Sequence, residues 1–199
     1  MRTRRPPPAR LGEARGQSLV EFALLLPLLL TIALGVVEIG YLLLDQQVVV
    51  RLSREGSNLI SRNTTLEDAV AALQTMSSRP VDFSTRSKVI FSVLKKGATT
   101  GTGNYDQIFL YQRREFGSLS DGSRLVTRGG GVFGGAPDYQ AANADNATGL
   151  QVTNVPSNLI APRGGMIYVT EIYTAHETLT PLAQFGISTP PTLYSIAYF

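Results

Sequence analysis

Hydrophobic residues are concentrated in one block near the start of the chain, from Leu19 to Leu44. An α-helix rises 1.5 Å per residue, so these 26 positions would form a helix of roughly 39 Å. Hydrocarbon in a bilayer is about 30 Å thick, so the block is long enough to cross a membrane. A helix buried in a soluble core is the other interpretation, but the chain has no second apolar stretch of similar length to pack against it.

The helical pattern continues beyond this block. Within residues 45–62, apolar residues recur at a spacing that places them on one helical face, with the charged residues elsewhere. This face comprises Val48, Leu52, Leu59 and Ile60. Gly56 and Asn58 weaken the pattern toward its end, because both have low helix propensity.

A second, short helix is expected over about 65–76. The sequence Thr64-Thr65-Leu66-Glu67 matches a capping box, in which Thr64 accepts a hydrogen bond from the backbone and Glu67 reaches back. One apolar stripe follows at helical spacing. It comprises Leu66, Ala69, Val70 and Leu73.

From Pro80 onward, segments rich in β-branched and aromatic residues alternate with glycine and proline. They predict an antiparallel sheet of about four strands, at 87–95, 105–113, 165–174 and 192–199. Residues 117–162 are rich in Gly, Asn and Ser and predict a long loop with short turns and a minor strand at 123–127.

The pattern as a whole predicts an α+β fold. A long N-terminal helix, whose first half is transmembrane, is followed by a small head domain built on an antiparallel sheet. We divide the chain into residues 1–16, a transmembrane helix at 17–44, a helix continuation with a short second helix at 45–78, and an extracytoplasmic head domain at 79–199.

The basic excess of the chain is local. The formal net charge is +3, but five arginines lie ahead of the Gly16-Gln17 junction, together with one acid, Glu13. The residues after the junction carry 13 basic and 14 acidic side chains. A nucleic-acid-binding domain keeps its positive charge in the folded part, so we expect no nucleic acid partner. Because the arginines crowd one side of the apolar block, we expect a cytoplasmic N-terminus and a head domain outside.

Candidate catalytic chemistry is sparse. The absence of cysteine excludes disulfides and cysteine-based metal sites. His176 is the only histidine, so it cannot found a usual zinc site, and we expect it on the surface. The glycine-rich run at 128–135 lacks the lysine of a phosphate loop, and no serine lies in a pattern that marks a nucleophile. We expect no catalytic residue, no metal and no cofactor, and hence no enzyme.

The stretch ARGQSLVEFALLLPLLL, at residues 14–30, carries the most specific signal. A short arginine-bearing segment ends at Gly16, and the carboxylate of Glu21, followed by Phe22, opens the apolar helix. This order resembles the processing site of type IV pilin-like proteins, and the pair Glu21-Phe22 is typical of the tight-adherence (Flp-type) branch. Together with GVVEIGY at 35–41, it is similar to the N-terminus of TadE-like proteins, which are minor pilins or pseudopilins of that system.

The resemblance implies how the chain is made and where it resides. A prepilin peptidase would cut after Gly16 on the cytoplasmic side, so that residues 1–16 are a leader and Gln17 becomes the first residue. The implied fold is pilin-like, and the implied location is the bacterial inner membrane, with incorporation into a pilus as a further step. The implied partners are the peptidase, other minor pilins, the major pilin, the inner-membrane assembly platform and membrane lipid.

The resemblance also implies an assembly role for Glu21 and Phe22. In assembled pilins the fifth-position carboxylate is thought to pair with the amino terminus of a neighbouring subunit. An ionised carboxylate is costly in hydrocarbon, so a charge that gains a partner on assembly disfavours unassembled and misregistered states. The simpler alternative is that Glu21 lies at the membrane interface, close to water.

Two further residues of the block depart from a plain apolar helix. Pro27 removes one backbone hydrogen bond and is expected either to kink the helix or simply to be tolerated there. Glu38 is a second carboxylate, for which we expect an intramembrane polar contact with another subunit or a membrane centre shifted toward the N-terminus. A glutamate is expected at this position from the resemblance, which does not say what it does.

Two other classes of protein remain possible from the sequence. One is a secreted or membrane-anchored enzyme or binding protein, because Ala33-Leu34-Gly35 is a passable signal peptidase site. The other is a bitopic sensor or scaffold that keeps its N-terminal segment. The apolar run that continues through Leu44 argues against the first.

Overall fold

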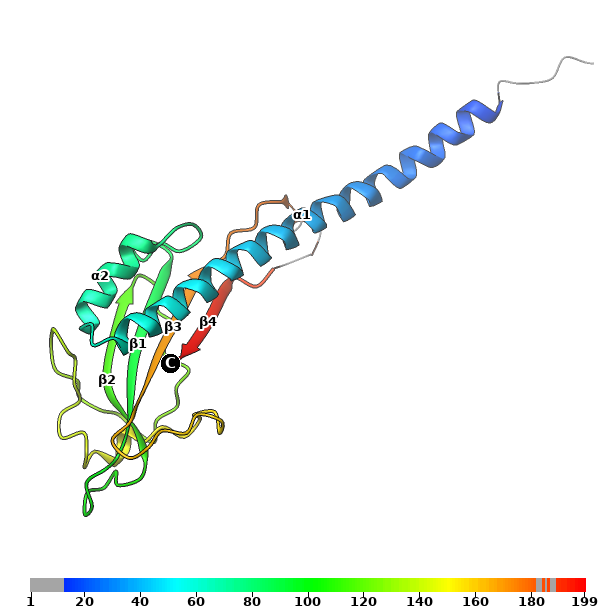
Figure 1. Ribbon diagram of the computed structural model, residues 1–199. Helices are drawn as coiled ribbons and strands as arrows, with labels where there is room; N and C mark the ends of the chain where they lie inside the picture. The colour runs from blue at the N-terminus through cyan, green and yellow to red at the C-terminus, as the bar shows by residue number, and fades with distance from the viewer. Residues whose placement is uncertain (1–12, 182–183, 185, 187–188) are drawn as a thin grey trace, which may run out of the picture. The chain divides into compact units, whose positions relative to one another are not determined.

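The computed structural model describes residues 13–181, 184, 186 and 189–199 (Figure 1). Residues 1–12, which make up most of the expected leader, lie outside the described residues. Along the described residues, seven elements follow in order. They are α1 (Glu13–Ser61), α2 (Leu66–Met76), β1 (Ser87–Lys96), β2 (Ile108–Gly117), the 3-10 helix η1 (Thr148–Leu150), β3 (Met166–Ala175) and β4 (Thr192–Tyr198).

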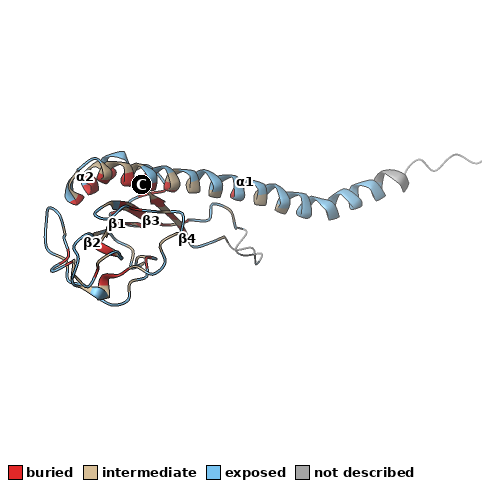
Figure 2. Ribbon diagram, turned by 60° about the horizontal axis from the view of Figure 1, so that its bottom comes forward, coloured by how far each residue is buried: buried red, intermediate tan, exposed pale blue. Residues whose placement is uncertain are grey.

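The chain forms two compact units. The first contains α1 up to Tyr41 together with residues 178–189, and the second contains residues 42–177 and 190–199. In the first unit the side chains from Leu19 to Leu30 are all exposed (Figure 2). A helix buried in a soluble core would hide these residues, so that interpretation is wrong for this chain. Among the described helices, this one is long and apolar enough to cross a membrane.

The second unit is built on a four-stranded antiparallel sheet in the order β2-β1-β3-β4. The α+β prediction is confirmed, and β1, β3 and β4 lie where the sequence placed them. The second strand is displaced, because it begins at Ile108 rather than at residue 105. Asp106 adopts a left-handed backbone with φ of 57°, which interrupts an extended strand at that point.

Helices cover one face of this sheet. The part of α1 beyond Tyr41 contributes Val49, Leu52 and Ile60 to the buried core, where they join Phe91 of β1 and Ile172 of β3. The buried stripe of α2 is the expected one, with Leu66, Ala69, Val70 and Leu73. The expected face of α1 is confirmed, since Val48 and Leu59 are half-buried against the same core, and Val49 is a further buried residue that the pattern did not include.

A close approach between α1 and the sheet explains why the helix contains Gly56. A Cβ atom at this position would lie 2.7 Å from Thr170 Cγ2 and 3.1 Å from Phe91 Cε1. On the same side of the helix, Ser57 donates to the carbonyl of Ala197 at 2.9 Å. Gly56 therefore weakens the local helix pattern but allows the helix to pack directly on β3 and β4.

The start of α2 is capped one residue later than expected. Thr65, not Thr64, is the N-cap, and its hydroxyl oxygen accepts from the backbone N–H of Asp68 at 3.1 Å. Glu67 does not reach back to the cap. It accepts instead from the hydroxyl of Tyr139 and lies 3.5 Å from Nε of Arg114.

The long connection between β2 and β3 covers the other face of the sheet. It buries Leu125, Ala144 and Leu150 against Phe109 and Val169 of the strands. The minor strand expected at 123–127 is absent from this part of the structure, where Thr127 forms only an isolated bridge with Val152. Instead, the hydroxyl of Ser123 and the backbone N–H of Arg124 donate to Glu171 of β3, as described below. The connection therefore forms the layer that covers the sheet face opposite the helices (Figure 2).

Candidate processing and assembly segment

The Gly16-Gln17 junction lies one turn inside the N-terminal end of α1, which begins at Glu13. Both residues are exposed. A Cβ atom at Gly16 would meet nothing within 4 Å, and the φ of this residue is not in the left-handed region. Packing among the described residues thus gives no reason for a glycine at this position. The first turn of a helix also has unpaired N–H groups, which makes it the easiest part of the helix to unwind.

Glu21 lies one helical turn after Gln17, and the two side chains are joined. Nε2 of Gln17 donates to Oε1 of Glu21 at 3.0 Å. Glu21 is exposed, and so is Phe22 beside it, at 58%. One neutral hydrogen bond replaces little of the hydration of an ionised carboxylate, so Glu21 would retain a large desolvation penalty in hydrocarbon.

Pro27 is accommodated within the continuous helix α1. It has no N–H to donate to the carbonyl of Ala23, the acceptor one turn earlier. One turn later, the hydroxyl of Thr31 donates to the carbonyl of Pro27 at 2.8 Å. This is the ordinary bond of a threonine hydroxyl to the preceding turn, and it does not replace the donor that the carbonyl of Ala23 lacks.

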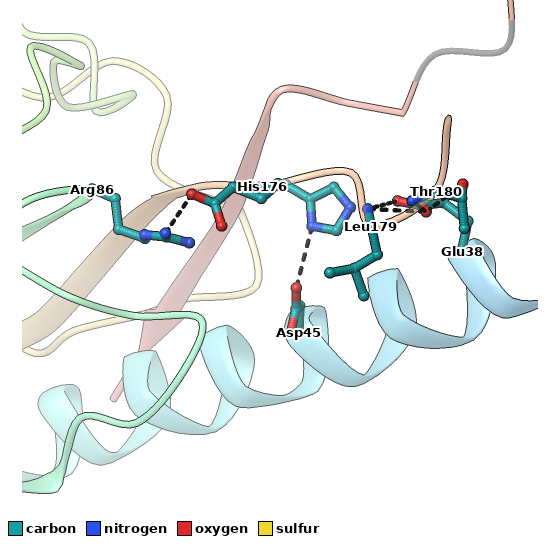
Figure 3. Close-up of polar contacts among 7 residues, drawn as sticks. Glu38, Asp45, Arg86, His176, Leu179 and Thr180 are labelled. Atoms are coloured by element: carbon teal, nitrogen blue, oxygen red, sulfur yellow. Dashed lines mark hydrogen bonds and ion pairs between the residues drawn. The ribbon is translucent and has the colours of Figure 1, made fainter. Parts of the chain in front are cut away.

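Glu38 is the one acidic residue of the apolar block that is buried, with 2% of its surface exposed. Its carboxylate accepts from the N–H groups of Leu179, at 3.2 Å, and of Thr180, at 2.9 Å (Figure 3). The hydroxyl of Thr180 donates to the same Oε2 atom at 2.8 Å. Hydrogen bonds to an ionised acceptor are roughly twice as strong as neutral ones. We call this contact the Glu38 clasp.

The clasp gives Glu38 a partner that the sequence did not suggest. The two expectations were a contact with another subunit or a shifted membrane, but the bonds come from the same chain, 141 and 142 residues further on. Backbone N–H groups are present in every residue, so no sequence pattern marks Leu179 and Thr180 as the donors. All three residues belong to the first unit.

His176 is buried, so its expected place on the surface is wrong. Its side chain has no exposed area, and Nδ1 lies 3.2 Å from Oδ2 of Asp45 (Figure 3). The next residue, Glu177, pairs with the guanidinium of Arg86. These contacts lie within the second unit and fix the chain immediately after β3.

A second buried carboxylate, Glu171, organises the head domain. It accepts from the hydroxyl of Ser123, from the N–H of Arg124 at 2.8 Å, and from the hydroxyl of Tyr194 at 3.0 Å. The guanidinium of Arg124 stacks on the ring of Tyr194, 3.7 Å from its centroid. Tyr173 packs against Tyr194, with ring centroids 4.7 Å apart. These five residues form what we call the Glu171 cluster.

The Glu171 cluster shifts the protonation equilibria of its tyrosines. Burial, reinforced by the charge of Glu171, raises the pKa of Tyr173 to about 12. Burial is also the leading reason that the pKa of Tyr194 is raised, followed by the charge of Glu171 and the hydrogen bond to it. Arg113 is linked to the cluster through Ser123, at 3.1 Å, and burial lowers its pKa.

The cluster is a structural network and has no features of a metal or catalytic centre. The acceptor sites of Glu171 are occupied by donors of the chain itself. Among the described residues, no group of three or more His, Cys, Asp or Glu side chains could hold a metal ion. A lone glutamate in the middle of a strand that is buried on both faces gives no local sequence signal for this role.

These observations define a class of protein with an exposed apolar N-terminal helix suited to a membrane and a small α+β head. Within this class, the TadE-like protein family matches residues 16–58, which are α1 from Gly16 nearly to its end. The segment is TadE-like, which confirms the resemblance seen in the sequence and is consistent with a TadE-like protein of the Tad pilus system. No curated protein and no solved structure matches the chain.

Proposed function

We propose that this chain is a minor pilin or pseudopilin of a Tad-type pilus, a non-enzymatic subunit that a prepilin peptidase cuts after Gly16. The observation that carries the proposal is the TadE-like match, which begins at Gly16 and runs through the exposed apolar helix. Gly16 has no packing role among the described residues, and recognition by a protease would account for a glycine there.

The proposal includes a topology. The arginines ahead of Gly16 favour a cytoplasmic N-terminus, with a single pass through the inner membrane and an extracytoplasmic head. Cleavage would remove these arginines and create an amino group on Gln17, one helical turn from Glu21. In this proposal Glu21 then pairs with the amino terminus of a neighbouring pilin, and the assembly platform is the other membrane partner.

Mass spectrometry of the mature N-terminus, in strains with and without the prepilin peptidase, tests this proposal. We expect the chain to start at Gln17 only where the peptidase is present. A Gly16→Val variant should remain uncut, because a β-branched side chain obstructs the cleavage site. Gly35→Val is the matched control, since Gly35 also has open space around its Cβ position.

The same pair of variants separates the alternatives. If the chain is a secreted protein, Gly35→Val blocks processing and the wild type starts at Val36. If it is a bitopic scaffold that keeps its leader, neither variant changes the N-terminus. Either result would overturn the pilin proposal.

A further inference from the structure

We propose that the turn Thr178–Thr180 lies in the lipid headgroup layer, and that the hydrocarbon span of α1 ends before Glu38 and not at Leu44. The inference rests on the proposed function only in that α1 spans a membrane.

The backbone of the turn sets the first constraint. Residues 178 and 179 have no regular secondary structure, and Thr180 is a bend. Irregular backbone exposed to lipid does not occur within hydrocarbon, because its N–H and C=O groups find no partners there. The Glu38 clasp holds this turn within 3.2 Å of the Glu38 carboxylate. The level of Glu38 must therefore lie outside the hydrocarbon.

Helix length supplies the second constraint. From Leu19 to Val37 there are 19 residues, which span roughly 28 Å and match a hydrocarbon layer of about 30 Å. A span that continued to Leu44 would exceed that thickness by roughly 9 Å. Part of the apolar run beyond Tyr41 has another use, since Leu42 packs against the core of the second unit.

The exposed side chains near the level of Glu38 are of kinds that suit a membrane–water interface. Leu179 is 61% exposed and Tyr41 is 49% exposed. Tyr41 lies three residues beyond Glu38, which is about 4.5 Å along the helix and within a headgroup layer. Tyrosine is enriched at this depth because its ring is apolar and its hydroxyl is polar. Residues 178–181 contain no Asp, Glu, Lys or Arg, so the turn itself brings no charged side chain that would oppose contact with lipid.

The chain contains no cysteine, so single cysteines can report depth without background. The full-length protein would be reconstituted in vesicles of phosphatidylcholine and phosphatidylglycerol. Spin labels would be placed at Leu28, Tyr41, Leu44, Leu179 and Ser120. Collision with oxygen and with a water-soluble nickel complex then measures the depth of each label.

We expect the label at Leu28→Cys to be deep and the labels at Tyr41→Cys and Leu179→Cys to be at headgroup depth. Those at Leu44→Cys and at the head control Ser120→Cys should be aqueous. A Leu179 label as aqueous as Ser120, or as deep as Leu28, would overturn the inference, as would a Leu44 label in hydrocarbon. If Leu28 itself is aqueous, the membrane span fails, and with it the proposed function.

A Glu38→Gln variant tests the clasp itself. Its amide group keeps one acceptor oxygen but replaces the charged carboxylate and turns the second oxygen into a donor, so the clasp should weaken. We expect the nickel complex to reach the Leu179 label about tenfold more readily, because one charged hydrogen bond contributes about this factor. Glu21→Gln is the matched control and should leave the Leu179 label unchanged. Equal accessibility in Glu38→Gln and wild type would show that another contact, such as a neighbouring subunit, holds the turn.

Discussion

Three glutamates show how the surroundings of a carboxylate decide its use. Glu171 and Glu38 are both buried and both saturated by donors of the chain itself. Glu21 is exposed on an apolar helix and has one neutral donor, Gln17. A buried carboxylate whose hydrogen bonds are all made within the chain stabilises a single fold. A carboxylate that is poorly solvated in hydrocarbon instead favours association with a positively charged partner. This difference makes Glu21 the residue to test for assembly.

Glu21→Gln should insert into the membrane normally but crosslink poorly to other pilins. The variant keeps the shape of the side chain and removes the charge that we propose pairs with a neighbouring amino terminus. Truncating one partner of a desolvated ion pair typically costs about 2–5 kcal/mol, so the crosslinked fraction should fall at least tenfold. The measurement is site-specific crosslinking in membranes that contain the other pilins.

Thr31→Val is the control for that experiment. It removes a hydroxyl that bonds to Pro27 in the same helix and changes no charge. Wild-type crosslinking in Glu21→Gln would instead support the simpler interpretation that Glu21 merely lies near water.

Gly56→Val should destabilise the head domain. The new Cβ would meet Thr170 and Phe91 at 2.7 and 3.1 Å, so α1 would have to move away from β3. Overpacking of this kind costs about 1–3 kcal/mol in the free energy of unfolding. Urea unfolding of the full chain in detergent, followed by circular dichroism, measures the loss.

Gly122→Val serves as the comparison, because a Cβ at Gly122 meets no atom within 4 Å. Its stability should stay within about 0.5 kcal/mol of the wild type, as for most surface substitutions. Equal losses in the two variants would mean that the close approach at Gly56 does not limit the packing.

At the scale of elements, the sequence predicted types better than boundaries. Periodicity identified both helices and composition identified the strands, because these signals come from residues near one another in the chain. The start of β2 was misplaced because Asp106 adopts a left-handed conformation and accepts from Arg163, at 3.2 Å. The strand expected at 123–127 is absent because Ser123 and Arg124 bind Glu171, 48 and 47 residues away. Such long-range partners are invisible to local patterns.

The cap of α2 offers a test at this scale. Thr65→Ala should lower the free energy of unfolding by about 1 kcal/mol, because the N–H of Asp68 loses its acceptor. The neighbouring Thr64→Ala is a matched control and should change stability little. Urea titration of both variants decides whether Thr64 or Thr65 is the N-cap. A larger loss of stability in Thr64→Ala would support the capping box expected from the sequence.

At the scale of the whole molecule, the sequence could not say which apolar residues face lipid and which pack on the head. Leu42 reads as part of one apolar run with Leu30, yet it packs against the core of the second unit while Leu30 is exposed. The same limit applied to the long connection, whose small and polar residues indicate a loop but not that it covers a sheet face. Both outcomes depend on surfaces formed only when distant segments meet.

The Glu171 cluster links the stability of the head to pH. In the unfolded chain a tyrosine loses its proton near pH 10, whereas Tyr173 in the folded protein holds its proton to about pH 12. Between these values the unfolded state binds fewer protons, so the free energy of unfolding falls as pH rises. This contribution to stability is fully present below pH 10 and is lost as the pH rises through the pKa of the folded state. The raised pKa of Tyr194 acts in the same direction.

For the full chain in detergent, the free energy of unfolding should therefore fall steeply with pH above pH 10. It should fall less steeply in Tyr194→Phe. That variant also starts from a lower stability at neutral pH, because Glu171 loses a hydroxyl donor. Tyr111→Phe, outside the cluster, should keep the wild-type slope. The chain has no tryptophan, so the ultraviolet absorbance of tyrosinate follows ionisation directly while circular dichroism follows unfolding. If the slope is the same in all three proteins, the two cluster tyrosines do not carry the alkaline transition, and another group must be sought.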